Sequence, residues 1–365
     1  MQSFHWQRAV LKIGSALISP KGEGCSVEFL LAIARFITSA RSQGKEIILV
    51  SSGSVAAGRG SIPVTHQPTI AEKQAMASIG QLQLMATWSR FFDFPCAQIL
   101  LTYGDLKDRT RYVNIKNTLT ELLRHQALPI VNENDSVAVN EIKVGDNDNL
   151  AAYTALVSQA DTLIICSDVD GLYSADPRKD ASASLISSVD EITEEHYALA
   201  GGAGSKVGTG GMRTKLQAAQ KCTLSGIQSL IVNGYKADTF EYLLQEKSPG
   251  TYFHPKISRS SARRHWLQHA LPVSGDILLD DGALTAIREK GASLLPSGIR
   301  QVKGSFLAGE AVTLSTQNGV FAKGLVLYGS DDLAHIIGKQ SHEIQSLLGF
   351  SNGEVVVHRD DLIKY

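Results

Sequence analysis

Six short runs of consecutive apolar residues recur along the first two thirds of the chain. They occupy residues 9–13, 46–50, 97–101, 128–131, 162–166 and 228–232. Apolar residues at consecutive positions, without alternation, are typical of strands that are buried on both faces of a sheet. The runs are separated by longer stretches, which parallel strands need for their crossover connections.

Helical spacing of apolar residues marks two of the intervening stretches. In 26–43 these residues fall near one face, and Gly44 follows as a C-terminal stop. Residues 110–126 show a similar pattern. The alternation of strands and helices predicts an α/β fold, a three-layer αβα sandwich around a mainly parallel sheet.

The sequence changes character after residue 246. Residues 247–272 contain three prolines, five Lys or Arg and no acid, which favours a connector that crosses a surface. Residues 273–365 are rich in turn sequences between short strands. We therefore expect a large domain over 1–246, a basic connector over 247–272, and a small β-barrel-like domain over 273–365.

Composition excludes several classes of protein. The 35 Lys and Arg nearly balance 36 Asp and Glu, whereas general nucleic-acid binders carry a basic excess. No apolar run approaches the ~18–20 residues of a membrane helix, and the N-terminus lacks the pattern of a secretory signal. The four cysteines are far apart, so we expect reduced thiols, with Cys166 a small hydrophobe in a buried strand. These features predict a cytoplasmic protein.

Ligands of such sheets bind beyond the C-terminal ends of the strands, so the residues there are candidates for chemistry. Lys12 lies inside the first apolar run, and Gly14 and Ser15 follow it. A buried lysine needs an anionic partner, either a structural carboxylate or a ligand. The second run ends in Ser51–Ser54, which could bind an anion or simply cap a helix.

Acids and amides crowd the segment after the fourth run. Asn132–Asp135 and Asp146–Asn149 follow one another within twenty residues. Carboxylates and amides can bind a substrate ammonium group, orient lysines or bind Mg²⁺. The spacing does not match an EF-hand, and helix capping explains at most part of the cluster.

A glycine-rich stretch, with Gly208, Gly210 and Gly211, leads into a helix whose first turns carry Arg213 and Lys215. Backbone N–H groups at such a helix start, with a lysine beside them, favour a phosphate site over a loop of no chemical role. The fifth run ends at Ser167 and Asp168, where a loop could lie against a nucleoside. Walker and dinucleotide-binding fingerprints are absent, and no Ser/His/Asp triad is legible.

Together these segments resemble the amino acid kinase family, and within it the glutamate 5-kinases that carry a C-terminal PUA domain. The resemblance rests on "VLKIGS", "ILVSSGSVAAG", "PIVNENDSVAVNEIKVGDNDNL", "SDVDGLYSADPR" and "GTGGMRTKLQAA", in the order of the family. In the tail, "GDILLDDGALTAI" and "GASLLPSGI" are similar to a PUA domain.

The resemblance implies ATP-dependent phosphorylation of the γ-carboxylate of L-glutamate, the first step of proline biosynthesis. Lys12 and Lys215 match the lysines that neutralise the phosphoryl group, and Asp148 matches the carboxylate that orients them. The implied glutamate-binding residues are Ser52, Gly53, Asp135 and Asn147. The implied ATP-binding residues are Lys12, Gly14, Ser15, Ser167, Asp168, Thr209, Gly210, Gly211, Met212, Arg213, Thr214 and Lys215.

The resemblance also implies Mg²⁺ on the ATP phosphates, with no metal site firmly assigned to the protein. It implies feedback inhibition by proline, a homodimer or homotetramer, and handover of the labile acyl phosphate to glutamyl phosphate reductase. Aspartate kinase and acetylglutamate kinase are alternative activities within the family. The C-terminal segment 273–365 and the cluster of acids and amides after the fourth apolar run disfavour both. RNA binding by the PUA segment is an alternative of another class. Its eight Lys and Arg against eleven acids over 275–365 argue against it.

Overall fold

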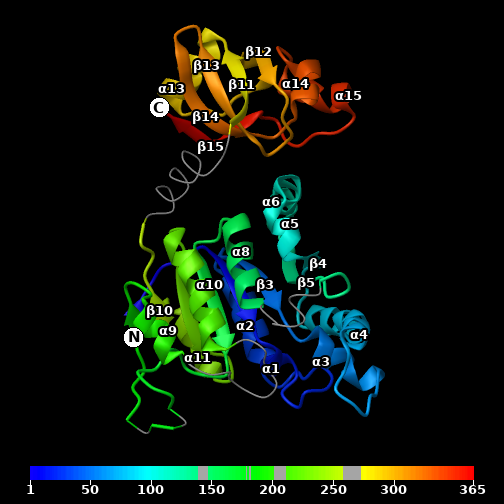
Figure 1. Ribbon diagram of the computed structural model, residues 1–365, viewed down its shortest axis with the longest axis vertical. Helices are drawn as coiled ribbons and strands as arrows, with labels where there is room; N and C mark the ends of the chain where they lie inside the picture. Colours follow the sequence, from blue (N-terminus) through cyan, green and yellow to red (C-terminus); the bar gives the residue numbers. More distant parts are fainter. Residues whose placement is uncertain (139–146, 178, 181, 201–210, 258–272) are drawn as a thin grey trace. The chain divides into compact units, whose positions relative to one another are not determined.

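The computed structural model describes residues 1–138, 147–177, 179–180, 182–200, 211–257 and 273–365 (Figure 1). The chain divides into two compact units. The first comprises Met1–Leu106 and Ile115–Arg259, and the second comprises Lys107–Asn114 and Ser260–Tyr365. Each unit has its own sheet and its own hydrophobic core.

The sheet of the first unit has the strand order β4-β5-β3-β2-β6-β8-β10-β7. The first six of these neighbours run parallel to one another. They are the six strands predicted from the apolar runs: β2 (Arg8–Ile13), β3 (Glu46–Ser51), β4 (Cys96–Leu101), β5 (Leu128–Glu133), β6 (Thr162–Ser167) and β8 (Gln228–Asn233). The predicted mainly parallel α/β sheet is therefore confirmed.

The start of the predicted connector is part of this unit. Strand β10 (Thr251–Phe253) pairs antiparallel with β8 and parallel with β7 (Ser188–Val189). Strand β9 (Lys247–Ser248) pairs with β1 (Gln2–Ser3). Prolines and basic residues suggested a surface crossing here, but Tyr252 and Phe253 are buried, and their burial holds the segment on the sheet.

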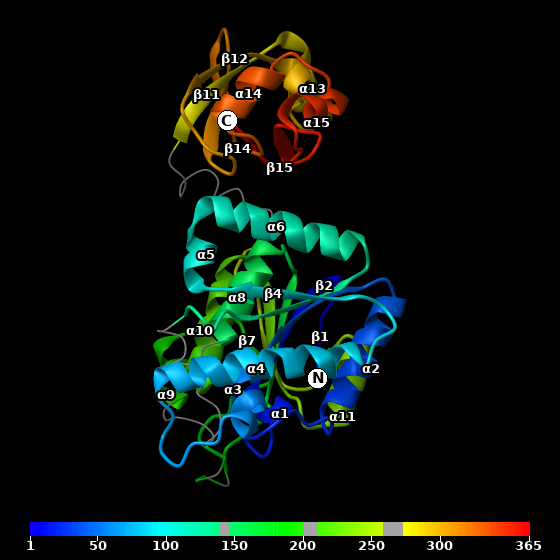
Figure 2. The ribbon, with the colours of Figure 1, turned by 90° about the vertical axis from the view of Figure 1, so that its right-hand side faces the viewer.

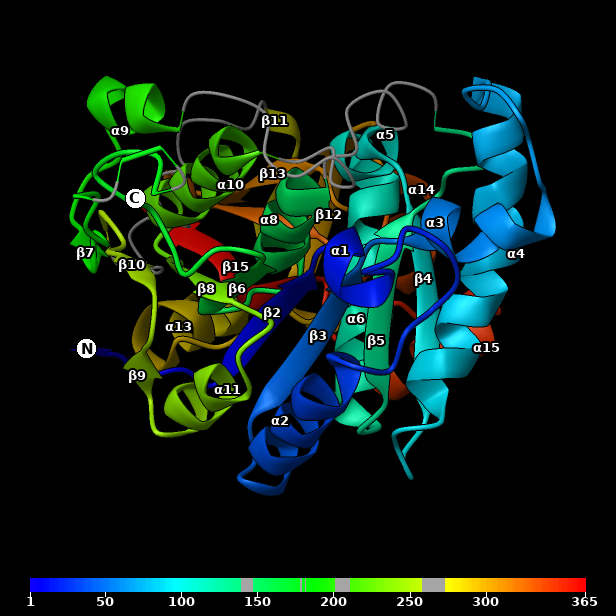
Figure 3. The same ribbon diagram turned by 90° about the horizontal axis from the view of Figure 1, so that it is seen from below.

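Helices cover both faces of the sheet (Figure 3). On one face, α2 (Leu30–Ser42) and α11 (Ala237–Leu244) share a core with the strands. On the other face lie α8 (Asn147–Val157) and α10 (Met212–Leu224), which pack on β2, β6 and β8. The two predicted helices are confirmed as α2 and as α6 (Arg109–Arg124). The shorter helices are α1 (Ser15–Ile18), α3 (Ser54–Gly58), α5 (Tyr103–Lys107) and α9 (Glu194–Leu199).

One long helix has no counterpart in the sequence-based prediction. Helix α4 (Ile70–Ser89) begins at Thr69, whose side chain accepts from the Glu72 N–H while the Glu72 carboxylate accepts from the Thr69 N–H. Apolar residues lie around much of its circumference, which blurs the one-sided pattern that a surface helix shows. Edge strand β4 also differs from prediction, because Leu100 is exposed instead of buried on both faces.

The alternation of side chains along β2 prepares the site. Leu11 and Ile13 point into the core shared with α2. Because neighbouring residues of a strand point to opposite faces, Lys12 between them faces α8 and α10. The lysine is only 6% exposed, so its charge must be matched inside the protein.

The second unit holds a five-stranded sheet, ordered β12-β11-β13-β14-β15. These strands are β11 (Val273–Leu279), β12 (Ile299–Gly304), β13 (Ala311–Thr316), β14 (Gly319–Val326) and β15 (Val357–Lys364). Figure 2 shows helices α13 (Asp281–Lys290), α14 (Ser330–Ile336) and α15 (Ile344–Leu348) beside them. Its core includes Ile277, Leu314, Tyr328 and Leu333, so this β-rich unit has a hydrophobic interior of its own.

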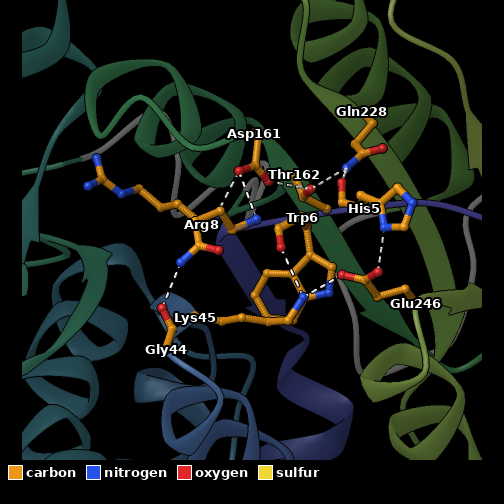
Figure 4. A network of polar contacts seen from close by, with 10 residues as sticks. His5, Trp6, Arg8, Gly44, Lys45, Asp161, Thr162, Gln228 and Glu246 are labelled. Atoms are coloured by element: carbon orange, nitrogen blue, oxygen red, sulfur yellow. Dashed lines mark hydrogen bonds and ion pairs between the residues drawn. The ribbon is translucent and has the colours of Figure 1, made fainter.

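A polar network joins the amino-terminal ends of the strands in the first unit (Figure 4). Lys45 donates to the Trp6 carbonyl (2.9 Å) and pairs with Glu246 (2.5 Å), whose other oxygen contacts His5. Both backbone N–H groups of Gln7 and Arg8 donate to Asp161 at 2.9 Å. These contacts join the start of β2 to the residues that precede β3 and β6.

Candidate active site

Three elements bring two lysines onto one buried carboxylate. The Nζ of Lys12, on β2, lies 2.6 Å from Oδ1 of Asp148 in the first turn of α8. The Nζ of Lys215, in the first turn of α10, lies 3.1 Å from Oδ2 of the same group. Thr214 donates its hydroxyl to Oδ2 at 2.7 Å. Residues predicted from three distant motifs thus form one cluster.

Among the contacts that the structure describes, the cluster brings two ammonium groups to one carboxylate. Burial raises the pKa of Asp148, but the ammonium groups of Lys12 and Lys215 lower it more, so the net pKa lies well below its usual range. The carboxylate therefore stays ionised at neutral pH. Lys12 and Lys215 are both buried, in a region where charges interact more strongly than in bulk water.

The turn after β2 leaves space beside this charge. Gly14 precedes α1, and a Cβ atom there would lie 3.9 Å from Lys12 Nζ and 3.7 Å from the Cys166 carbonyl. Ser15 is the first residue of α1. Gly211 caps α10 in an extended conformation. Arg213 instead lies over the ring of Tyr197, 5.2 Å from its centroid, on the side of α9.

Part of the predicted phosphate loop lies outside the described residues, namely Thr209 and Gly210, together with Gly208. Met212, Arg213 and Thr214 open α10 directly after it.

A chain of amides extends from the charged cluster. Asn147, next to Asp148, donates to the Ser51 carbonyl (3.4 Å) and to Oδ1 of Asn132 (2.8 Å). Asn132 in turn donates to Oε1 of Gln81 on α4 at 2.8 Å. Gln81 was not anticipated, because its helix was not.

The direction of this amide chain is fixed by backbone groups at two points. The Ser51 carbonyl can only accept, and the N–H of Glu133 donates to Oδ1 of Asn132 at 2.9 Å. These backbone groups orient the amides of Asn147 and Asn132, and Asn132 then presents its side-chain N–H to Oε1 of Gln81.

The second carboxylate of the site, Asp135, follows β5 and lies in a different environment. Its Oδ2 accepts from the Ser54 hydroxyl at 2.7 Å. Burial raises the pKa of Asp135, and the hydrogen bond from Ser54 offsets this only in part. This contrasts with Asp148, because the interactions that shift the pKa of Asp135 include no cation.

Ser52 and Gly53 connect β3 to α3 beside these groups. The Ser52 N–H donates to the Ile13 carbonyl at 3.1 Å, so the turn is attached to the end of β2. Gly53 has φ +100°, a conformation that favours glycine, and a Cβ there would lie 3.0 Å from Ile18. The residues predicted to bind glutamate thus follow β3 and β5 or begin α8, and no hydrogen bond described joins Asp135 to Asn147.

The last predicted pair comprises Ser167, the final residue of β6, and Asp168, which follows it. The Ser167 hydroxyl donates to Oδ1 of Asp168 at 3.1 Å, and Asp168 is exposed. No hydrogen bond or ion pair joins these two to the Lys12 cluster among the described residues.

A group near Ser167 was not predicted. Asp170 pairs with Lys236 at 2.7 Å and accepts from Asn233 (2.8 Å) and from the Tyr173 hydroxyl (3.1 Å). It joins the loop after β6 to the end of β8. Its sequence signal was the polar residues that follow those two strands.

Lys12, Ser52, Asp135 and Ser167 lie at or just beyond the carboxyl ends of parallel strands, where ligand sites of such sheets are found. A family model described as "Amino acid kinase family" matches residues 7–233. The chain belongs to the amino acid kinase family. A second model, described as "PUA domain", matches residues 275–348. The family match therefore covers the first sheet except β10, and the PUA match covers most of the second sheet.

Curated relatives within the family span the chain from end to end. A protein from Idiomarina loihiensis named "Glutamate 5-kinase" is 52% identical over 100% of this chain and 99% of its own. A "Glutamate 5-kinase" from Salinibacter ruber is 52% identical over 98% and 97%. Among solved structures, a UMP kinase from Bacillus anthracis is similar over 69% of this chain and 97% of its own, with 14% identity and a TM-score of 0.48.

Two further observations concern metals and membranes. In the described ranges, no group of three or more His, Cys, Asp or Glu is arranged to hold a metal ion. None of the helices that the structure describes is both long enough and apolar enough to span a membrane. The four cysteines are free, and Cys166 is buried in β6 as predicted.

Proposed function

We propose that this chain phosphorylates the γ-carboxylate of L-glutamate with ATP, giving L-glutamyl 5-phosphate, the first step of proline biosynthesis. The observation that carries the proposal is the buried cluster of Lys12 and Lys215 on Asp148. The names of relatives at about half identity over the whole chain support the choice of substrate.

The chemistry suits such a cluster. The γ-carboxylate is already ionised at neutral pH, so it needs no general base to attack phosphorus. The barrier comes instead from bringing two anions together in line, which cations and N–H donors lower. In this proposal Lys12 and Lys215 stabilise the transferring phosphoryl group, and Asp148 holds both amines in place.

The remaining roles follow from position. We assign the substrate ammonium to Asp135, a buried carboxylate whose described interactions include no cation. Further contacts with glutamate are assigned to Ser52, Gly53 and Asn147. ATP would lie along Gly14, Ser15, Ser167 and Asp168, with the segment Thr209–Lys215 around its phosphates.

Mg²⁺ would enter on the ATP phosphates and reduce their charge. Both oxygens of Asp148 already have lysine or threonine partners, so this residue is not placed as a metal ligand. The ammonium groups of Lys12 and Lys215 are instead suited to bind the phosphate groups of ATP directly.

We also propose feedback inhibition by proline, a homodimer or homotetramer, a cytoplasmic location and transfer of the labile product to glutamyl phosphate reductase. We propose a first domain that extends past residue 246 to include strands β9 and β10, and a second domain from residue 273. These properties follow from the resemblance to the family and are open to direct measurement.

One assay tests the function. The protein is incubated with ATP, Mg²⁺ and glutamate, aspartate or N-acetylglutamate, with ADP release and hydroxamate formation as readouts, with and without proline. Of the three amino acids, we expect only glutamate to be phosphorylated, and we expect proline to inhibit this reaction. Preference for aspartate or N-acetylglutamate would contradict the proposal and indicate aspartate kinase or acetylglutamate kinase activity. A salt-dependent gel shift with tRNA would support the RNA-binding alternative.

A further inference from the structure

Ser54 occupies an unusually well-fixed position for a serine at the start of a short helix. Its hydroxyl donates to Oδ2 of Asp135 at 2.7 Å, and the residue is 4% exposed. The preceding Gly53 turns the chain with φ +100° against Ile18. On the other side, a Cβ added to Gly80 of α4 would lie 1.9 Å from the Ser54 carbonyl oxygen.

Two glycines therefore hold Ser54 between α1 and α4. The backbones of α3 and α4 approach closely, since a Cβ on Gly58 would lie 1.9 Å from the Met76 carbonyl. A serine fixed in this way loses little further freedom when its hydroxyl points at one carboxylate oxygen. The result is a donor positioned before any ligand arrives.

The turn that carries Asp135 receives its other side-chain contacts from uncharged groups. Gln74 of α4 donates to the Ser136 carbonyl, and Ser78 contacts the Ser136 hydroxyl. Glu141 and Lys143, which follow in the sequence, lie outside the described residues. Among the contacts described, the hydroxyl of Ser54 is the one that favours the charged form of Asp135.

We propose that Ser54 is a positioning residue for substrate recognition, which holds one oxygen of Asp135 and directs the other toward the ammonium group of the amino acid substrate. This inference rests on the proposed function. One oxygen of Asp135 is taken by the hydroxyl, so the other has a defined direction. Ser54 thus acts through Asp135 and need not touch the substrate.

The test measures KM for glutamate against pH in Ser54→Ala, Ser54→Thr and wild type. We expect Ser54→Ala to raise this KM by about 10-fold, the effect of one hydrogen bond to a charged group. The rise in KM on acidification should begin at higher pH than in wild type, because the uncharged carboxyl is no longer disfavoured. The kcat and the KM for ATP should stay near wild type, and Ser54→Thr, which keeps the hydroxyl, should restore the profile.

Two further variants separate the explanations. Ser158→Ala removes another buried serine hydroxyl, bonded to the Thr154 carbonyl, and should leave KM unchanged. In an Asp135→Asn background, Ser54→Ala should add little, because the charge through which it acts is gone.

The outcomes distinguish failure of the role of Ser54 from failure of substrate recognition by Asp135. A wild-type KM and pH profile in Ser54→Ala, or a KM raised equally at every pH, would overturn the role of Ser54. If Asp135→Asn itself left KM for glutamate unchanged, the proposed recognition by Asp135 would fall first. A folded Ser54→Ala protein, checked by thermal unfolding, is required for each reading.

Discussion

The two ends of the same parallel sheet use lysine in opposite ways. At the amino end, Lys45 pairs with Glu246, bonds a backbone carbonyl and lies 4.4 Å from the centroid of the Trp6 ring (Figure 4). At the carboxyl end, Lys12 and Lys215 share Asp148 and are both almost fully buried. The first arrangement pairs one ammonium group with one carboxylate, whereas the contacts described for the second bring two ammonium groups to one carboxylate. In the proposed function, the second arrangement is the one that meets the phosphate groups of ATP.

The largest expected effect is on Asp148. Asp148→Asn leaves two buried ammonium groups without their carboxylate, so we expect unfolding to become easier by about 3–5 kcal/mol. Urea denaturation of the unliganded protein measures this. A variant within about 1 kcal/mol of wild type would show that the cluster is not electrostatically coupled.

Lys215→Ala should lower kcat by at least about 100-fold, the scale of losing one donor to the transition state. The matched control is Lys45→Ala at the other end of the sheet, which should keep kcat near wild type. Steady-state kinetics with ATP and glutamate compare the two. Equal kcat values in both variants would remove the functional contrast between the two ends.

A smaller effect is expected at Asp135, and its sign is opposite to that of Asp148. Because the folded protein raises the pKa of Asp135, this group favours folding at low pH and the benefit is lost as pH rises through the folded pKa. Asp135→Asn should therefore stabilise the unliganded protein by roughly 0.5–2 kcal/mol at neutral pH, while it raises KM for glutamate. Thermal unfolding against pH tests the sign, and destabilisation at neutral pH would contradict it.

The smallest effect belongs to the amino end. The hydrogen bond from Lys45, opposed by burial and aided by His5, lowers the pKa of Glu246. Its contribution to stability is present above the pKa of the unfolded chain and is lost as pH falls through the folded pKa. Glu246→Gln should cost below about 1 kcal/mol, because the pair is partly exposed. The difference from wild type should vanish in acid, with kcat unaffected.

The sequence predicted the parts of the fold that depend on local pattern. Consecutive apolar runs identified β2, β3, β5, β6 and β8, since strands buried on both faces need such runs. Lysine within one of them predicted a buried ion pair, which Asp148 supplies. Edge strand β4 was also found, but its exposure depends on having no neighbour on one side, which the sequence does not encode locally.

What could not be predicted depends on contacts between distant residues. The Ser54–Asp135 bond joins two residues 81 positions apart, and Gln81 reaches Asn132 across 51. The pairing of β10 with β8 was hidden because Pro249 and Pro255 flank the strand and resemble a linker. In each case tertiary packing decides what local composition leaves open.

The pairing of β1 with β9 has a practical consequence for dissecting the chain. Gln2 and Ser3 pair with Ser248 and Lys247 in a separate two-stranded sheet, which joins the start of the first unit to a segment near its end. A fragment that ends at residue 246 would lack β9 and β10, and β8 would become an edge strand, unpaired on one side. Excision of a catalytic fragment should therefore retain residues through at least His254, whose N–H bonds the Val189 carbonyl.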